Sequence, residues 1–298
     1  MKRKITIFFV CILGMLCLPD NASAQSYYNN DSSWKLGGNF GVMFNQVAQT
    51  NWSAGGENQV GLNLQLDYTA NYLKDRQLWD NRLELEYGFN KTKSDGSKKT
   101  ADNIYLSSIY GYEIAKNLYF SGTFIFNTQF ANGYNYNASS DADNVFISTF
   151  MAPGYLNIGA GITWTPKTWF KATINPVAYR GIFVLNEELS DQGQFGVDPG
   201  DRYRTEFGAN IILELNKNLT SNINLYSRLN LYSNYLEDAQ NVDINWQVKL
   251  NMNVNSWITT SISTNLIYDD GVLILKDGKY EPRLQFQEIL AIGLQFRF

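Results

Sequence analysis

The sequence predicts an all-β fold, an up-and-down antiparallel β-barrel of twelve strands that crosses a membrane. Apolar and polar side chains alternate with a period of two through almost the whole chain after residue 33, which is the pattern of strands between two different environments. The connections between these segments are short and long in turn. Beyond the first 24 residues there is no run of about eighteen apolar residues. A closed barrel is then the remaining way to span a membrane.

The first six alternating segments fill the first half of the chain. In the first of them Trp34, Leu36 and Phe40 share one face. The second is rich in leucine, and the third carries acidic and basic residues on its polar face. The fourth and fifth place tyrosine and phenylalanine on the apolar face, and the sixth ends at Trp164. The predicted strands span residues 34–45, 60–72, 79–89, 103–112, 118–130 and 156–164.

The last six segments continue the pattern to the C-terminus. The seventh is the weakest, whereas the tenth is the clearest because Val242, Ile244 and Trp246 share one face. Asp243 and Asn245 lie on the opposite face. Twelve is an even number, as single-chain bacterial barrels require. The predicted strands span residues 170–174, 203–215, 219–231, 242–254, 258–268 and 284–298.

The connections predict how the barrel is oriented. Bacterial outer-membrane barrels have short periplasmic turns and longer extracellular loops. The two kinds alternate here without exception, so both termini are expected in the periplasm. The short connections are 73–77, 114–116, 165–168, 216–218 and 255–256, and the long ones are 48–59, 90–102, 131–149, 181–202, 234–241 and 269–283.

The first 24 residues have the anatomy of a secretory signal peptide. Lys2, Arg3 and Lys4 precede an apolar stretch, and the small residues 22–24 form a cleavage site. A lipoprotein anchor at Cys17 is the alternative, but Leu16 stands where a small residue is wanted. We therefore expect a leader at 1–24, a short periplasmic segment at 25–33 and the barrel at 34–298, secreted across the inner membrane to the outer membrane of a Gram-negative cell.

The polar faces predict what lines the barrel lumen. Charges of both signs are expected there in near balance, which argues against a strongly ion-selective pore built from rings of one sign. The lining fits either a weakly selective channel or a lumen closed by its own ion pairs. The predicted lumen-facing charges are Lys35, Asp67, Arg82, Glu84, Glu86, Lys171, Arg204, Glu206, Arg228, Asp243 and Lys249.

The composition argues against most enzyme chemistry. The chain has no histidine, the commonest proton carrier, and its two cysteines lie in the predicted leader. Histidine and cysteine ligands for zinc or copper are therefore missing from the mature chain. No cofactor or metal site is predicted, and the formal net charge of −4 gives no reason to expect nucleic acid as a partner. The protein is predicted not to be an enzyme.

The C-terminal strand resembles the closing strand of Gram-negative outer-membrane barrels. It alternates up to a terminal aromatic, with Phe298, Phe296 and Leu294 on one face. In such barrels the assembly machinery recognises this strand, so these residues are the predicted insertion signal, and outer-membrane lipid and that machinery are the expected partners.

Several phrases add a second resemblance. They include WKLGGNFG at 34–41, NWSAGGEN at 51–58, FGVDPG at 195–200 and LIYDDG at 266–271. Together they resemble a family of uncharacterised outer-membrane barrels known only as a domain of unknown function. The resemblance implies an outer-membrane barrel and no established activity.

Two functions are therefore expected. The first is a passive channel for small polar solutes, whose conductance would depend on Arg82 and Arg204. The alternative is a non-conducting structural or accessory barrel that binds an envelope partner through its long loops.

Overall fold

The computed structural model describes residues 33–47, 49, 58–92, 96–135, 145–237, 239–276 and 279–298. The predicted leader at 1–24, nearly all of the segment at 25–33 and most of the first long loop lie outside the described residues.

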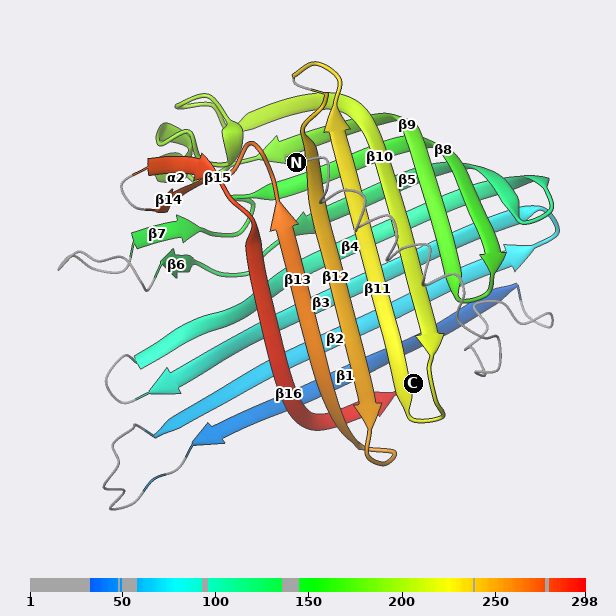
Figure 1. Ribbon diagram of the computed structural model, residues 1–298, viewed down its shortest axis with the longest axis horizontal. Helices are drawn as coiled ribbons and strands as arrows, with labels where there is room; N and C mark the ends of the chain where they lie inside the picture. Colours follow the sequence, from blue (N-terminus) through cyan, green and yellow to red (C-terminus); the bar gives the residue numbers. More distant parts are fainter. Residues whose placement is uncertain are drawn as a thin grey trace.

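Among the described residues, twelve antiparallel strands close into a barrel (Figure 1). Each strand pairs with the next barrel strand along the chain, and β1 closes the ring by pairing with β16. The predicted twelve-stranded meander is therefore confirmed. The barrel strands are β1 (Trp34–Val47), β2 (Gln59–Lys74), β3 (Gln77–Thr92), β4 (Gly96–Ala115), β5 (Leu118–Thr128), β8 (Gly154–Lys167), β9 (Phe170–Phe183), β10 (Tyr203–Asn218), β11 (Ile223–Asn234), β12 (Val242–Asn253), β13 (Ile258–Tyr268) and β16 (Gln285–Arg297).

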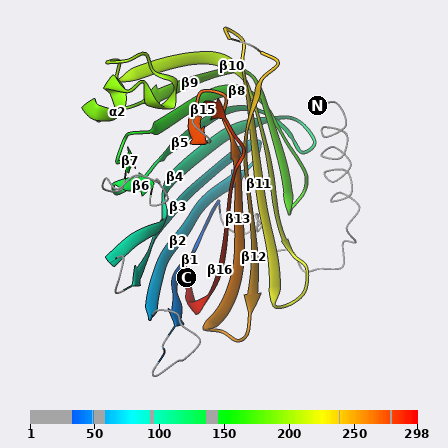
Figure 2. The ribbon, with the colours of Figure 1, turned by 60° about the vertical axis from the view of Figure 1, so that its left-hand side comes forward.

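The long connections carry small elements that the alternation pattern did not predict. They are β6 (Gly133–Asn135), β7 (Val145–Ser148), α2 (Glu187–Asp191), the 3₁₀ turn η1 (Gln194–Gly196), β14 (Leu273–Lys276) and β15 (Lys279–Pro282). All of them gather at one end of the barrel, which we call the long-loop end (Figures 1 and 2). A small apolar core holds part of this end together, built from Ala152, Val184, Leu189 and Val197.

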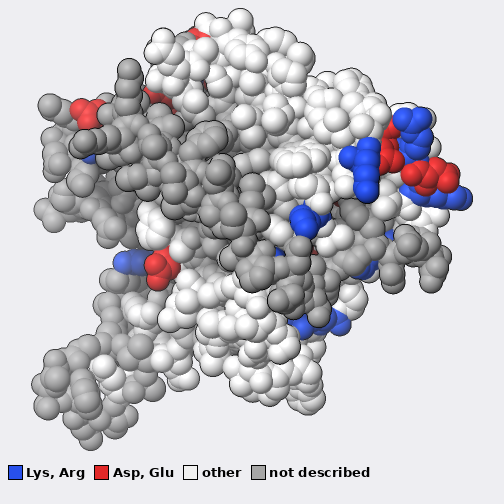
Figure 3. All heavy atoms as spheres, turned by 45° about the vertical axis from the view of Figure 1, so that its right-hand side comes forward, with Lys and Arg blue, Asp and Glu red and all other residues white. Residues whose placement is uncertain are grey.

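The outer surface of the barrel is apolar. Leu36, Phe120, Leu290 and Phe296 are each more than half exposed, which is the orientation expected of lipid-facing side chains. Near the short turns Trp34 packs against Tyr72 and Trp79, with ring centroids 5.2 and 5.5 Å away. In Figure 3 most of the described surface is uncharged, and charged atoms gather toward the edge where the short turns lie. The described part of the chain contains no helix that is long and apolar enough to cross a membrane.

The two prolines that interrupt the alternation lie in different places. Pro153 follows a cis peptide bond just before β8, at the long-loop end. The alternation in the sequence predicts that Pro176, like Pro153, lies at the extracellular end of its strand, and that prediction is wrong. It lies in the middle of β9, at a bulge where the register shifts against both β8 and β10. A bulge tolerates proline because the extra residue is left out of the hydrogen-bond ladder.

Candidate functional site: the barrel lumen

The strand period places the polar faces inside the barrel. Because successive side chains point to opposite faces, residues opposite the apolar exterior point into the lumen. All eleven predicted lumen charges occupy such positions. Lys35, at the short-turn end, is exposed, whereas Glu84 and Glu206 are 2% and 7% exposed. The lumen is therefore closely packed in some places and open in others.

The most buried charges form a bridge across the lumen. Arg228 of β11 donates from Nη1 to Oε1 of Glu84 on β3 at 2.8 Å, and its Nη2 lies 3.3 Å from Oε2. Five strands separate β11 from β3 in either direction around the ring. The pair therefore joins opposite walls of the barrel, and it is bidentate, the stronger geometry for an arginine and a carboxylate.

Tyrosine and arginine side chains surround this bridge. The Arg228 guanidinium carbon lies 3.6 Å from the ring centroid of Tyr105, and that of Arg82 lies 4.1 Å from the ring of Tyr226. Arg82 also pairs with Asp67 and, at 2.6 Å, with Glu84. Each buried charge therefore faces an opposite charge or an aromatic ring, which offsets its loss of water.

Two further groups of charges lie above and below the bridge. Nearer the short turns, Lys171 lies 2.9 Å from Asp80 and 2.7 Å from Glu214. Nearer the long loops, Arg180 of β9 reaches Asp243 of β12 at 2.5 Å and stacks 3.7 Å from the ring centroid of Tyr232.

The second of these groups continues into the loops. Arg204 pairs with Glu206 at 3.3 Å and with Glu237, and it donates to the carbonyl of Gly196 in η1 at 2.8 Å. Arg204 therefore attaches the loop between β9 and β10 to the lumen wall.

One side of the lumen is packed shut. The inward side chains in the middle of β4, β5, β9 and β10 are buried, and Tyr105, Ile125 and Ile212 form an apolar cluster inside the barrel. Ser121, Thr163 and Thr173 form a buried chain of hydroxyl contacts at 2.8 and 2.9 Å. Solutes cannot pass through this half because side chains fill it.

The other side is open to solvent. Every described inward side chain of β12 and β16 is at least partly exposed, as are three of the five on β13. These strands are neighbours in the barrel. Their inward surface also includes the apolar Ile267, Ile289 and Ala291. We call its polar part the amide strip, because side-chain amides dominate it; its residues are Asn245, Gln247, Lys249, Asn251, Ser263, Asn265, Gln285 and Gln287. Water reaches into the barrel along the amide strip.

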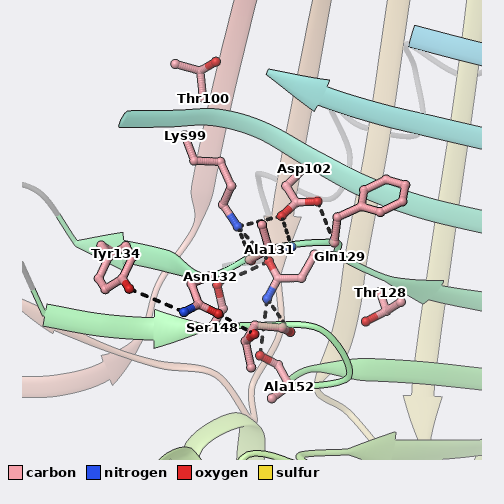
Figure 4. Close-up of polar contacts among 12 residues, drawn as sticks. Lys99, Thr100, Asp102, Thr128, Gln129, Ala131, Asn132, Tyr134, Ser148 and Ala152 are labelled. Atoms are coloured by element: carbon pink, nitrogen blue, oxygen red, sulfur yellow. Dashed lines mark hydrogen bonds and ion pairs between the residues drawn. The ribbon is translucent and has the colours of Figure 1, made fainter. Parts of the chain in front are cut away.

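The long-loop end is held by a network of loop contacts (Figure 4). Lys99 of β4 donates from Nζ to Asp102 at 2.7 Å and to the carbonyl of Ala131 at 2.7 Å. Asp102 also accepts from the backbone N–H groups of Phe130 and Ala131. Gln129 donates to the carbonyl of Thr149 at 2.9 Å. These contacts hold the base of the β6–β7 hairpin in place. Lys99 and Asp102 therefore have a structural role.

The sequence analysis missed several lumen residues. Arg180 was missed because the bulge at Pro176 inverts the alternation: Ile174 points outward before it, and Val177 and Tyr179 point outward after it. The proline itself was the available signal. Glu214 continues the polar face of β10 and was overlooked. The alternation places Tyr105 and Tyr226 on the polar faces of their strands, but no sequence signal predicts that they pack against the arginines of the bridge.

A comparison with known families gives one match. Residues 44–134 match a family described as "Protein of unknown function (DUF3078)". The predicted resemblance to a family of unknown function is confirmed. The chain is a closed twelve-stranded β-barrel. The matched segment runs from β1 through β6, so it includes Asp67, Arg82, Glu84 and Glu86.

Solved structures give more distant similarities. The chain is similar to an outer membrane channel from Pseudomonas putida F1, at 13% identity and a TM-score of 0.39, covering 93% of this chain and 100% of that chain. It is similar to the translocator domain of the autotransporter NalP from Neisseria meningitidis, at 11% identity and a TM-score of 0.38, covering 99% and 98%. It is also similar to OmpT of Vibrio cholerae, at 9% identity and a TM-score of 0.31, covering 92% and 100%. No curated protein sequence matches the chain.

Proposed function

We propose that this protein is a passive outer-membrane channel for small polar solutes, with both termini in the periplasm and the long loops outside the cell. The observation that supports the proposal most is the solvent exposure of the amide strip along one side of a barrel whose other side is packed shut. Neutral amides and hydroxyls offer hydrogen bonds to any polar solute and hold none of them strongly. Such a passage would be narrow and off-centre.

The channel is tested by single-channel conductance of the refolded barrel in a planar bilayer. Ser263 and Thr264 are neighbours on β13, and Ser263 points into the lumen whereas Thr264 points to the lipid. S263W should lower the conductance steps several-fold, because the indole would occupy the open side. T264W is the matched control and should leave them unchanged. Equal conductance in both variants would overturn the assignment of the passage.

A second candidate is a non-conducting barrel that binds an envelope partner through its loops. The bridge from Arg228 to Glu84 across the lumen favours it, since a salt bridge between opposite walls narrows any passage. A bilayer without conductance steps, together with heat-modifiable migration that demonstrates a folded barrel, would favour this second function. Co-purification with another envelope protein would support it further.

A further inference from the structure

Two charged side chains in the middle of the lumen differ from their neighbours. Arg82 and Arg228 are both ion-paired at this height. Among the residues that the structure describes, Lys249 of β12 has no hydrogen bond and no ion pair, and Glu86 of β3 has no ion pair. Within the described part of the lumen, these two side chains therefore carry opposite charges without an ion-pair partner.

Glu86 keeps one oxygen available. Its Oε1 accepts hydrogen bonds from Asn63 Nδ2 at 2.9 Å and from Gln65 Nε2 at 3.1 Å. These two amides hold the carboxylate in a fixed position on the wall. Its Oε2 has no hydrogen-bond partner among the described residues and is not a buried atom, so it contacts solvent. The Lys249 ammonium also has no hydrogen-bond partner among the described residues, and it contacts solvent because it is not a buried group.

The two charges flank the open side of the lumen, each one inward position from the Arg228–Glu84 bridge. Arg228, which bridges to Glu84 across the lumen, also donates to Gln247 Oε1 of β12 at 3.1 Å. Gln247 and Lys249 are successive inward residues of β12, and Glu84 and Glu86 are successive inward residues of β3. Around the barrel, β12 and β3 are separated by β13, β16, β1 and β2. A solute that moves along the amide strip therefore passes between a cation on one wall and an anion on the other.

We propose that Lys249 and Glu86 form a subsite for small zwitterions, such as amino acids and short peptides. The carboxylate of the solute would face the Lys249 ammonium and its ammonium would face Glu86 Oε2, while Gln247 and Ser263 beside Lys249 offer hydrogen bonds to a peptide group. The inference rests on the proposed function, because it names the solute class of the same passage. Charge-assisted contacts in a partly solvated site favour the zwitterion over an uncharged analogue by about fivefold.

The test uses the whole barrel and four probes of similar size. They are glycylglycine, the uncharged N-acetylglycinamide, the anion N-acetylglycine and the cation glycylglycinamide. Liposome swelling measures the entry of each probe, and calorimetry measures its binding to the detergent-solubilised barrel. We expect glycylglycine to bind and to enter about fivefold faster than N-acetylglycinamide. K249Q and E86Q should each remove most of this preference, and added salt should weaken it.

Two control variants remove the same charges elsewhere. K116Q lies in the short turn between β4 and β5, and E188Q lies on the exposed face of α2. Both should keep the preference for glycylglycine. Heat-modifiable migration shows that each variant is folded, so that a loss of binding cannot be ascribed to an unfolded barrel.

The possible outcomes separate the two proposals. Entry of all four probes at equal rates, unchanged in K249Q and E86Q, would overturn the zwitterion subsite and leave the channel intact. Binding of glycylglycine that depends on both residues, without entry of any probe, would overturn the channel and support the subsite. Absence of both binding and entry would overturn both.

Discussion

At the scale of single residues, the bridge between Arg228 and Glu84 should dominate the stability of the barrel interior. Arg228 is 9% exposed and Glu84 is 2% exposed. Removal of Arg228 leaves the buried Glu84 with Arg82 as its cationic partner, and Glu84 shares Arg82 with Asp67. We therefore expect R228Q to lower the free energy of unfolding by about 3 kcal/mol, the lower end of the range for a broken buried pair. Urea unfolding in lipid vesicles measures the change.

A double variant separates two effects of R228Q, which are the weaker pairing of the Glu84 carboxylate and the lost packing of the Arg228 side chain. E84Q/R228Q leaves two neutral amides at the bridge, and it should recover much of the stability that R228Q loses. Arg82 would still face Asp67 in this variant. A double variant as unstable as R228Q would mean that packing around the guanidinium, and not its charge, accounts for the loss.

Asp269 should make the long-loop end sensitive to pH. It follows β13 directly, and its Oδ1 accepts from the backbone N–H of Gly271 at 2.9 Å. Burial raises the pKa of Asp269 above its ordinary value of 3.8, and so does the nearby Asp243 carboxylate, against the opposing pull of Arg180, the Gly271 N–H and Arg204. A raised pKa in the folded state means that the protonated acid is favoured there. The stability that Asp269 contributes is then fully present below pH 3.8, and it is lost as the pH rises through the raised pKa.

A conservative variant tests this dependence. Asparagine resembles the protonated acid, so D269N should remove the loss of stability that sets in above pH 3.8. The pH profile of the unfolding midpoint, measured beside that of D270N, checks it. The neighbouring Asp270 is exposed, so D270N serves as the matched control. If the profiles of the wild type and D269N coincide, Asp269 does not control the pH dependence.

At the scale of elements, the seam between β1 and β16 decides whether the barrel closes. Phe298 and Gly38 exchange both backbone hydrogen bonds, at 2.8 and 3.1 Å, and the Phe298 ring stacks 6.3 Å from that of Tyr68. A Cβ atom on Gly38 would lie 2.6 Å from the tip of this ring. Glycine at this position therefore leaves room for the terminal aromatic residue.

Deletion of Phe298 should weaken the seam by about 2 kcal/mol, because two backbone hydrogen bonds of about 1 kcal/mol each are lost. F298A keeps the backbone and removes only the ring, so it should cost less stability. Urea unfolding of the two refolded variants measures the difference. If F298A slows assembly in cells as much as the deletion does, the ring acts as the predicted insertion signal and not only as a closure of the seam.

The elements also show how far a sequence can predict this molecule. The alternation fixes which side of each strand faces lipid, so the twelve strands and the inward positions of Arg82 and Lys249 could be predicted. It does not reveal which inward side chains meet across the lumen, because Arg228 and Glu84 are 144 residues apart. A bulge also inverts the pattern without changing the composition, which is why Arg180 was missed. The small hairpins and α2 depend on loop packing, which has no period.

At the scale of the whole molecule, the unequal packing of the lumen can be mapped directly. The predicted mature chain has no cysteine, so single cysteines can be introduced and labelled with a charged, membrane-impermeant thiol reagent. Ser263 lies on the open amide strip, Ser121 is 1% exposed on the packed side, and Thr264 faces the lipid. We expect rapid labelling of S263C and slow labelling of S121C and T264C, because the thiolate must meet the reagent in water.

The labelling pattern tests the architecture on which both proposals depend. Equal labelling of S263C and S121C in the folded barrel would mean that water fills the lumen evenly, and the off-centre passage would be wrong. Slow labelling of both would mean a lumen closed throughout, which would favour the non-conducting barrel. Preferential labelling of S263C, slowed by glycylglycine and not by N-acetylglycinamide, would connect the passage to the Lys249–Glu86 subsite, because a bound zwitterion would shield Ser263, the cross-strand neighbour of Lys249.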